Sequence, residues 1–205
     1  MIEANSSTHV LPNVDASKVY LTTDRLNKIE VEDLRLAAIH EVGHAALCDW
    51  ADFGAWPHVY PNPYYYGSGE FVNPDEHLPE RRYGLAQKLW LGACRANWHR
   101  MPPDVCRWAT LAGWIAEQIE IHGIDWIADW ISNPFPLALH LRGHIDSGSI
   151  SASDLEMMGR WTQKDLVKVL RILRRNWPVI LEWAKQVMDD PRIDREGNRA
   201  QLVIP

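Results

Sequence analysis

The stretch VEDLRLAAIHEVGHAALCDW, residues 31 to 50, carries the strongest pattern in this sequence. Its apolar residues recur at the three- and four-residue spacings of one helix face, and acidic residues stand where its first turn would be. The pattern predicts a helix from Val31 to Trp50. Within it, His40, Glu41 and His44 form the motif His-Glu-x-x-His.

The spacing of His40 and His44 suits a metal ion. Residues four apart on a helix differ by about 40° around the axis and by one turn along it, so both imidazoles can reach one ion. Glu41 lies about 100° around from His40, where it would flank the ion as a general base rather than bind it. The alternative is that the His-Glu-x-x-His motif occurs here by chance. The apolar residues around it favour a zinc site, because they would bury the helix in surroundings of low dielectric constant.

A catalytic zinc site usually has a third protein ligand and one open position. The Gly and third His of the metzincin pattern are absent after His44. Cys48 lies one turn further along, but ligands spread over three turns of one helix diverge, so we expect a packed thiol there. Glu117 and Glu120 in a predicted downstream helix, and Asp154 at a loop-to-helix junction, are the better candidates.

The rest of the chain is predicted to be mainly helical, with any small β element in residues 51–80, which are rich in Pro, Gly and Tyr. Further helices are expected over 79–101, 102–123, 124–131, 137–144 and 162–188. Asp104 is a candidate N-cap, and Gly123 would follow the end of its helix. Pro178 would either kink the last helix or begin a new segment.

Composition favours one globular domain. The chain has 205 residues, of which 46% are hydrophobic and 23% charged. A net charge of -6 leaves RILRR, residues 171–175, as the only notable basic run, so no nucleic-acid partner is expected.

The sequence has no signal peptide and no long apolar run, which predicts a cytoplasmic protein without membrane contact. Residues 1–20 are predicted to form an irregular arm and residues 190–205 a loose tail.

Three segments resemble, in the same order, parts of the FtsH-type ATP-dependent zinc metalloproteases. AAIHEVGHAAL, residues 37–47, resembles their metal-binding helix. LAGWIAEQI, residues 111–119, is similar to their LAGRxAEE helix, and SGSISASDLEMM, residues 147–158, resembles their TGASNDLxxAT segment. The resemblance covers the middle of the chain, from about Leu34 to Met158.

This resemblance implies a single-domain, zincin-like metallopeptidase fold and one Zn²⁺ per chain. It makes His40 and His44 zinc ligands, Asp154 the third ligand and Glu41 the catalytic base. Glu117 then becomes an outer-shell acid or an alternative ligand. Asp154 can also complement the start of a helix, with Ser151 or Ser153 as the cap.

The sequence departs from that family in two respects. It contains no GxxxxGK[ST] nucleotide-binding motif and no membrane anchor, so we expect a free-standing, ATP-independent peptidase domain. Residues 51–103 appear as an insertion relative to the family. Within it, GSGEFV, residues 67–72, would be either a substrate-binding edge strand or a surface turn.

The predicted function is that of a zinc metalloendopeptidase, in which a metal-activated water attacks the peptide bond and Glu41 is the general base. Its substrates would be peptides or unfolded protein segments. Two alternatives remain: a catalytically weak regulatory or interaction protein with the same fold, and a zinc hydrolase of a non-peptide amide. The sequence gives no indication of the oligomeric state.

Overall fold

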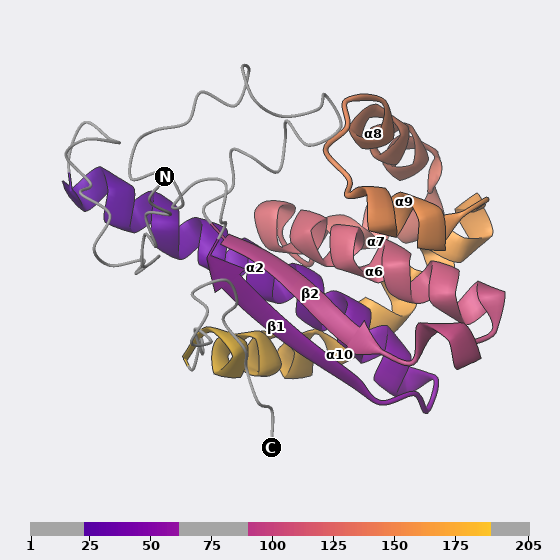
Figure 1. Ribbon diagram of the computed structural model, residues 1–205. Helices are drawn as coiled ribbons and strands as arrows, with labels where there is room; N and C mark the ends of the chain where they lie inside the picture. Colours follow the sequence, from indigo (N-terminus) through magenta and orange to yellow (C-terminus); the bar gives the residue numbers. More distant parts are fainter. Residues whose placement is uncertain (1–22, 62–89, 190–205) are drawn as a thin grey trace, which may run out of the picture.

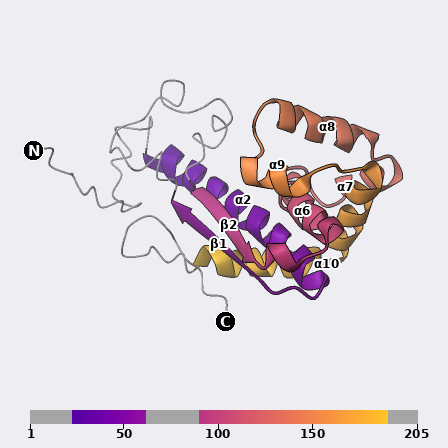
Figure 2. The same ribbon diagram turned by 45° about the vertical axis from the view of Figure 1, so that its right-hand side comes forward.

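The computed structural model describes residues 23–61 and 90–189, which are mainly helical with one small antiparallel sheet (Figures 1 and 2). The predicted mainly α class with a small β element is therefore confirmed. The predicted arm (1–20), the tail (190–205) and GSGEFV (67–72) lie outside the described residues. The described helices are α2 (Thr23–Trp50), α6 (Pro103–His122), α7 (Trp126–Ser132), α8 (Phe135–Asp146), α9 (Ala152–Met158) and α10 (Gln163–Asp189).

Helices α2 and α6 form the centre of the fold because small residues let them approach closely. A Cβ atom on Gly43 would lie 2.6 Å from the carbonyl oxygen of Ala112 and 2.8 Å from the Cβ atom of Ala116. Ala38, Ala112 and Ala116 are fully buried. The glycine of the His-Glu-x-x-His segment therefore has a packing role, and it brings α6 next to the two histidines.

Helix α10 packs against both α2 and α6 and closes the core from one side. It also contacts α7 and α8. Its buried residues recur at helical spacing, which accounts for its docking through one apolar face. They are Leu166, Val169, Leu170, Ile172, Leu173, Trp177, Ile180, Ala184 and Val187.

The sheet consists of β1 (Ala55–Pro61) and β2 (Trp90–Ala96), which pair antiparallel with Val59 opposite Gly92. Both strands contact α2, and the backbone N–H of Trp90 donates a hydrogen bond to Asp33 Oδ2 at 2.8 Å. Pro57 within β1 suits an edge strand, where a missing N–H costs least. In Figure 1, β2 lies between β1 and helices α6 and α9.

The predicted helix over 79–101 is wrong where the structure describes it. Residues 90–96 form β2, and the 3₁₀ turn η3 (Trp98–Arg100) follows. Apolar spacing there is compatible with a helix, but pairing with β1 supplies the backbone hydrogen bonds and packing against α2 buries Trp90. The expectation of a sheet within 51–80 thus holds for β1 and fails for β2.

The other predicted helices are present with adjusted ends. α2 begins at Thr23 rather than Val31, and α10 continues through Pro178. The candidate N-cap Asp104 is wrong, because Pro102 holds that position and Asp104 lies in the first turn of α6. Gly123 follows α6 as expected, with a φ of 90°.

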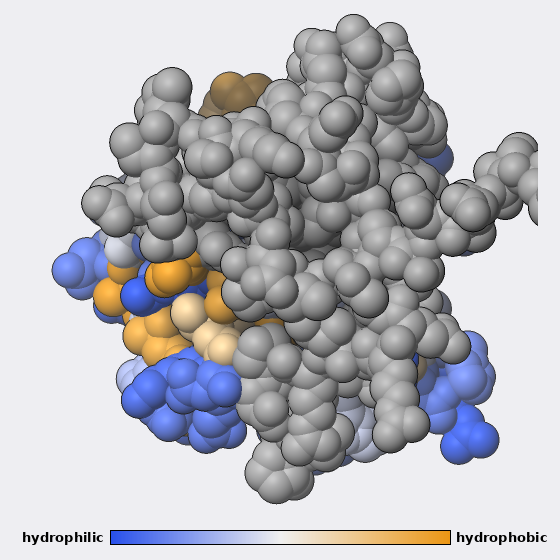
Figure 3. All heavy atoms as spheres, turned by 60° about the vertical axis from the view of Figure 1, so that its left-hand side comes forward, coloured by the Kyte–Doolittle hydropathy of each residue, from blue (hydrophilic) through white to orange (hydrophobic). Residues whose placement is uncertain are grey.

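The surface of the described residues is mixed in character. Large exposed apolar side chains are spread over several elements, and Figure 3 shows apolar groups beside strongly hydrophilic ones on one face. None of the helices in residues 23–61 and 90–189 combines the length and apolar character needed to cross a membrane.

Candidate metal centre

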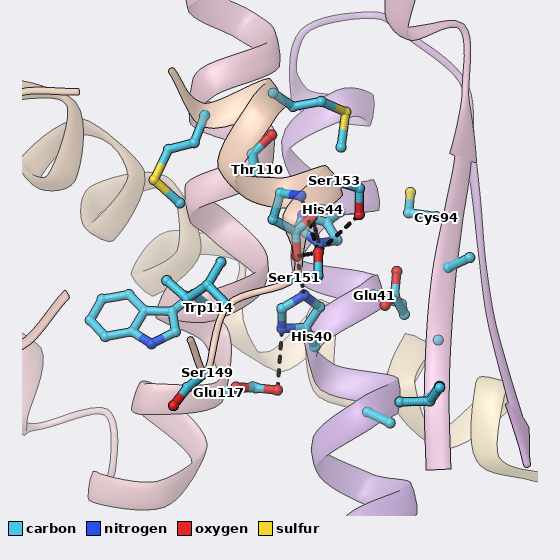
Figure 4. A pocket seen from close by; sticks show the side chains of 18 of the residues that line it. His40, Glu41, His44, Cys94, Thr110, Trp114, Glu117, Ser149, Ser151 and Ser153 are labelled. Atoms are coloured by element: carbon cyan, nitrogen blue, oxygen red, sulfur yellow. Dashed lines mark hydrogen bonds and ion pairs between the residues drawn. The ribbon is translucent and has the colours of Figure 1, made fainter. Parts of the chain in front are cut away.

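Two helices bring three side chains together, His40 and His44 from α2 and Asp154 from α9. Nε2 of His40 lies 3.6 Å from Oδ2 of Asp154, and Nε2 of His44 lies 3.7 Å from Oδ1 of the same carboxylate. One ligand atom from each residue lies within 4.8 Å of the others. The imidazole rings of His40 and His44 have centroids 4.6 Å apart (Figure 4).

The far side of each imidazole is held by α6. Nδ1 of His44 donates a hydrogen bond to the carbonyl oxygen of Ala109 at 2.8 Å. Nδ1 of His40 lies 3.2 Å from Oε1 of Glu117, at ion-pair distance although without hydrogen-bond alignment. Such partners orient a metal-binding histidine and leave Nε2 to face the ion. Glu117 therefore lies behind His40 rather than beside Asp154.

Gly113 on α6 provides the space that the two imidazoles occupy. A Cβ atom there would lie 2.5 Å from Nε2 of His44 and 2.9 Å from Nε2 of His40. Any larger residue would push into the side of the rings that faces Asp154. The glycine is therefore part of the site, although it has no functional group of its own.

Asp154 is positioned by the start of its own helix. Ser151 is the N-cap of α9, and its Oγ accepts a hydrogen bond from the backbone N–H of Asp154 at 3.0 Å. The Ser151 hydroxyl lies 2.7 Å from Asp154 Oδ2 and donates to it. The expectation that Ser151 or Ser153 caps this helix is confirmed for Ser151. The cap fixes the carboxylate in front of the two histidines.

Glu41 is buried between α2 and β2, with 7% of its surface exposed. A Cβ atom on Gly92 of β2 would lie 2.6 Å from Oε1 of Glu41, so the strand makes room for this carboxylate. Figure 4 shows Glu41 on the β2 side of the cleft, apart from the side chains that interact with His40. The structure thus separates Glu41 from the three-residue group while keeping it in the same cleft.

Charges in the site act strongly on one another. Burial alone lowers the pKa of His40, but the carboxylates of Glu117 and Asp154 outweigh it and raise this pKa to about 10. Burial and the neighbouring His40 charge lower the pKa of His44 to about 4. Burial would raise the pKa of Asp154, but the two histidines hold it below its ordinary value. An anionic carboxylate that faces two imidazoles is a set of donors that suits a cation.

The group formed by His40, His44 and Asp154 could hold a metal ion. Zinc bonds to nitrogen and oxygen donors of about 2.0–2.2 Å place tetrahedral ligands about 3.3–3.6 Å apart. The separations of 3.6 and 3.7 Å are close to that range. These two distances go to different oxygens of the Asp154 carboxylate, and one ligand atom from each of the three residues lies within 4.8 Å of the others, so an ion bound by all three would draw the donor atoms closer together.

Two other candidates are not part of this group. Cys48 is fully buried in the core, as expected for a packed thiol. Glu120 forms an ion pair with Arg35. Sequence reasoning missed Gly92 and Gly113, although a glycine inside the predicted helix LAGWIAEQI was a signal of close packing.

The group formed by His40, His44 and Asp154 lies in a cleft of about 510 Å³. One wall is β2, from Trp90 to Cys94, and the opposite wall contains Ser149, Ile150 and Ser151 before α9. The remaining lining is largely apolar and includes Tyr60, Trp98, Trp114, Met157 and Met158. The cleft is therefore accessible beside Glu41 and has apolar walls.

No protein-family model matches this chain, and no curated protein matches it either. The functional assignment therefore depends on the chemistry of the site.

Proposed function

We propose that this chain is a zinc metallopeptidase that hydrolyses peptides or unstructured segments without ATP. The observation that carries the proposal is the convergence of His40, His44 and Asp154 beside a buried Glu41 that is not part of their group. The resemblance of the three sequence segments to FtsH-type metalloproteases is consistent with this arrangement.

Zinc is the ion that this donor set fits best. His40 and His44 would supply neutral imidazole nitrogens and Asp154 a carboxylate oxygen, a combination found in catalytic zinc sites with one open position. When bound, zinc polarises a carbonyl group and lowers the pKa of water. Glu117 and the carbonyl of Ala109 hold the imidazoles in the orientation that binding needs.

Glu41 acts as the general base. Its carboxylate accepts the proton of the attacking water and then donates it to the leaving amine of the peptide. Burial against Gly92 limits the positions that its side chain can adopt. A carboxylate held in this way needs little reorganisation during the reaction.

A peptide is favoured as substrate by the position of β2. This strand lines the cleft from Trp90 to Cys94, and among the described residues it pairs with β1 alone. An extended peptide can add to a strand edge through main-chain hydrogen bonds. The apolar walls of the cleft would then receive the peptide's side chains.

The test compares wild type, Glu41→Gln and Glu156→Gln on a library of unstructured peptides, with cleavage followed by mass spectrometry. Glu41→Gln keeps the size of the side chain but cannot accept a proton. We expect its cleavage rate to fall by roughly two to four orders of magnitude, with zinc content unchanged. Glu156 is exposed on α9 and serves as the matched control.

Equal cleavage by wild type and Glu41→Gln would show that the activity arises elsewhere. Absence of any peptide cleavage by zinc-loaded wild type would favour one of the two alternatives. Turnover of small non-peptide amides would then identify an amidohydrolase, and its absence would favour a regulatory protein.

A further inference from the structure

A second pair of histidines on α8 has nearly the same geometry as the pair on α2. His140 and His144 are four residues apart, and their ring centroids lie 4.7 Å apart with an interplanar angle of 85°. The corresponding values for His40 and His44 are 4.6 Å and 85°. The second pair therefore presents two imidazoles at the spacing that suits one ion.

A buried amide orients the first of these rings. Nε2 of His140 lies 3.0 Å from Oε1 of Gln118 on α6. Because an amide oxygen only accepts hydrogen bonds, Nε2 carries the proton and Nδ1 of the neutral ring keeps its lone pair. Gln118 is only 3% exposed. A buried polar group thus fixes the tautomer of His140, as partners of metal-binding histidines do.

The surroundings favour the neutral form of His140 and leave the pair accessible to solvent. Burial, together with the neighbouring His144 and His122, lowers the pKa of His140. The ring centroid of His122 lies 6.4 Å from that of His140. His140 and His144 line a surface groove together with Gly143. A Cβ atom added to Gly143 would meet no other atom within 4 Å, so there is open space beside the pair. An ion could reach this pair from solvent.

This pair is separate from the metal centre described above. The ring of Trp114 lies 5.7 Å from that of His140 and 5.5 Å from that of His144. Trp114 also lines the cleft that contains His40 and Asp154. The two histidine pairs therefore lie near the same tryptophan but line different cavities.

We propose that His140 and His144 bind a second divalent transition-metal ion at the surface of α8. Imidazole donors select zinc, nickel or copper over calcium and magnesium, which require oxygen ligands. The proposal does not depend on peptidase activity or on occupancy of the first site.

The test measures bound zinc per chain by equilibrium dialysis for wild type, His140→Gln, His144→Gln and the double variant. His99→Gln, at an exposed histidine of η3, is the control. We expect each α8 variant to weaken binding of one ion by more than about tenfold and the double variant to bind about one ion fewer. His99→Gln should match wild type.

The test compares the number of zinc ions bound per chain between wild type and the α8 variants. Its outcome therefore does not depend on whether the first site binds zinc. If the first site were absent, the count would fall from one to none instead of from two to one. A nickel titration should show the same loss and a calcium titration no binding. Equal zinc and nickel binding by wild type and the double variant would overturn the proposal.

Discussion

Oδ1 of Asp154, on α9, lies 3.7 Å from Nε2 of His44, on α2. The other oxygen of the same carboxylate lies 3.6 Å from Nε2 of His40. The short helix α9 therefore supplies the carboxylate that faces both histidines of the long helix α2. This relationship sets the expected ranking of variants.

The first prediction concerns that ranking. Asp154→Ala removes the proposed third ligand and should nearly abolish zinc binding, whereas Glu117→Gln removes only the charge behind His40 and should weaken zinc binding by about 10–100-fold. Zinc titrations of both variants, with Glu156→Ala as an exposed control on α9, test this order. A greater loss from Glu117→Gln would move the ligand role to Glu117.

The second prediction compares two glycines in helices. Gly113→Ala places a Cβ atom 2.4 Å from the His44 ring, so it should lower the free energy of unfolding by about 1–3 kcal/mol and weaken zinc binding. Gly143→Ala meets open space and should stabilise α8 by about 0.5–1 kcal/mol. Denaturant unfolding measures both. Similar effects of the two variants would contradict the close contact at Gly113.

The third prediction concerns the release of a proton when zinc binds. In the metal-free protein the carboxylates around His40 outweigh burial and raise its pKa to about 10, while the pKa of His44 is lowered to about 4. At neutral pH His40 is therefore charged and His44 neutral. Because zinc binds neutral imidazole, binding should release about one proton from His40. Calorimetry in buffers of different ionisation enthalpy measures this number, and a heat independent of the buffer would contradict it.

The fourth prediction concerns Asp165 at the start of α10. Its carboxylate accepts hydrogen bonds from Trp108 Nε1 at 2.7 Å and from the backbone N–H of Thr162 at 2.8 Å. Burial raises the pKa of Asp165, but these bonds and the nearby Arg107 lower it overall. Asp165→Asn should therefore lower the free energy of unfolding by about 1–2 kcal/mol at neutral pH.

The pH dependence of this effect has a defined sign. A carboxylate with a lowered folded pKa contributes stability above its unfolded pKa of about 3.9 and loses it as the pH falls through the folded value. The difference between wild type and Asp165→Asn should therefore shrink in acid. A difference that stays constant between neutral and strongly acidic solution would show that the charge of Asp165 is unimportant.

Local patterns predicted most helices because their apolar residues repeat along one face. LAGWIAEQI and the segment from Gln163 to Met188 are helical as expected. Residues 90–96 were misassigned because strand pairing depends on β1, a partner distant in sequence. Asp104 was misassigned as a cap because Pro102 and Pro103 already set the start of α6.

The sequence by itself determined that His40, Glu41 and His44 share one helix, because a spacing of four residues fixes their relative directions. Residue spacing left the third member open among Glu117, Glu120 and Asp154, and within the sequence only the resemblance to FtsH-type metalloproteases favoured Asp154. Only the tertiary structure placed Asp154 against both imidazoles and Glu117 behind His40. That choice depends on how closely α2, α6 and α9 pack, and the packing depends on space at Gly43 and Gly113 that a local pattern does not encode.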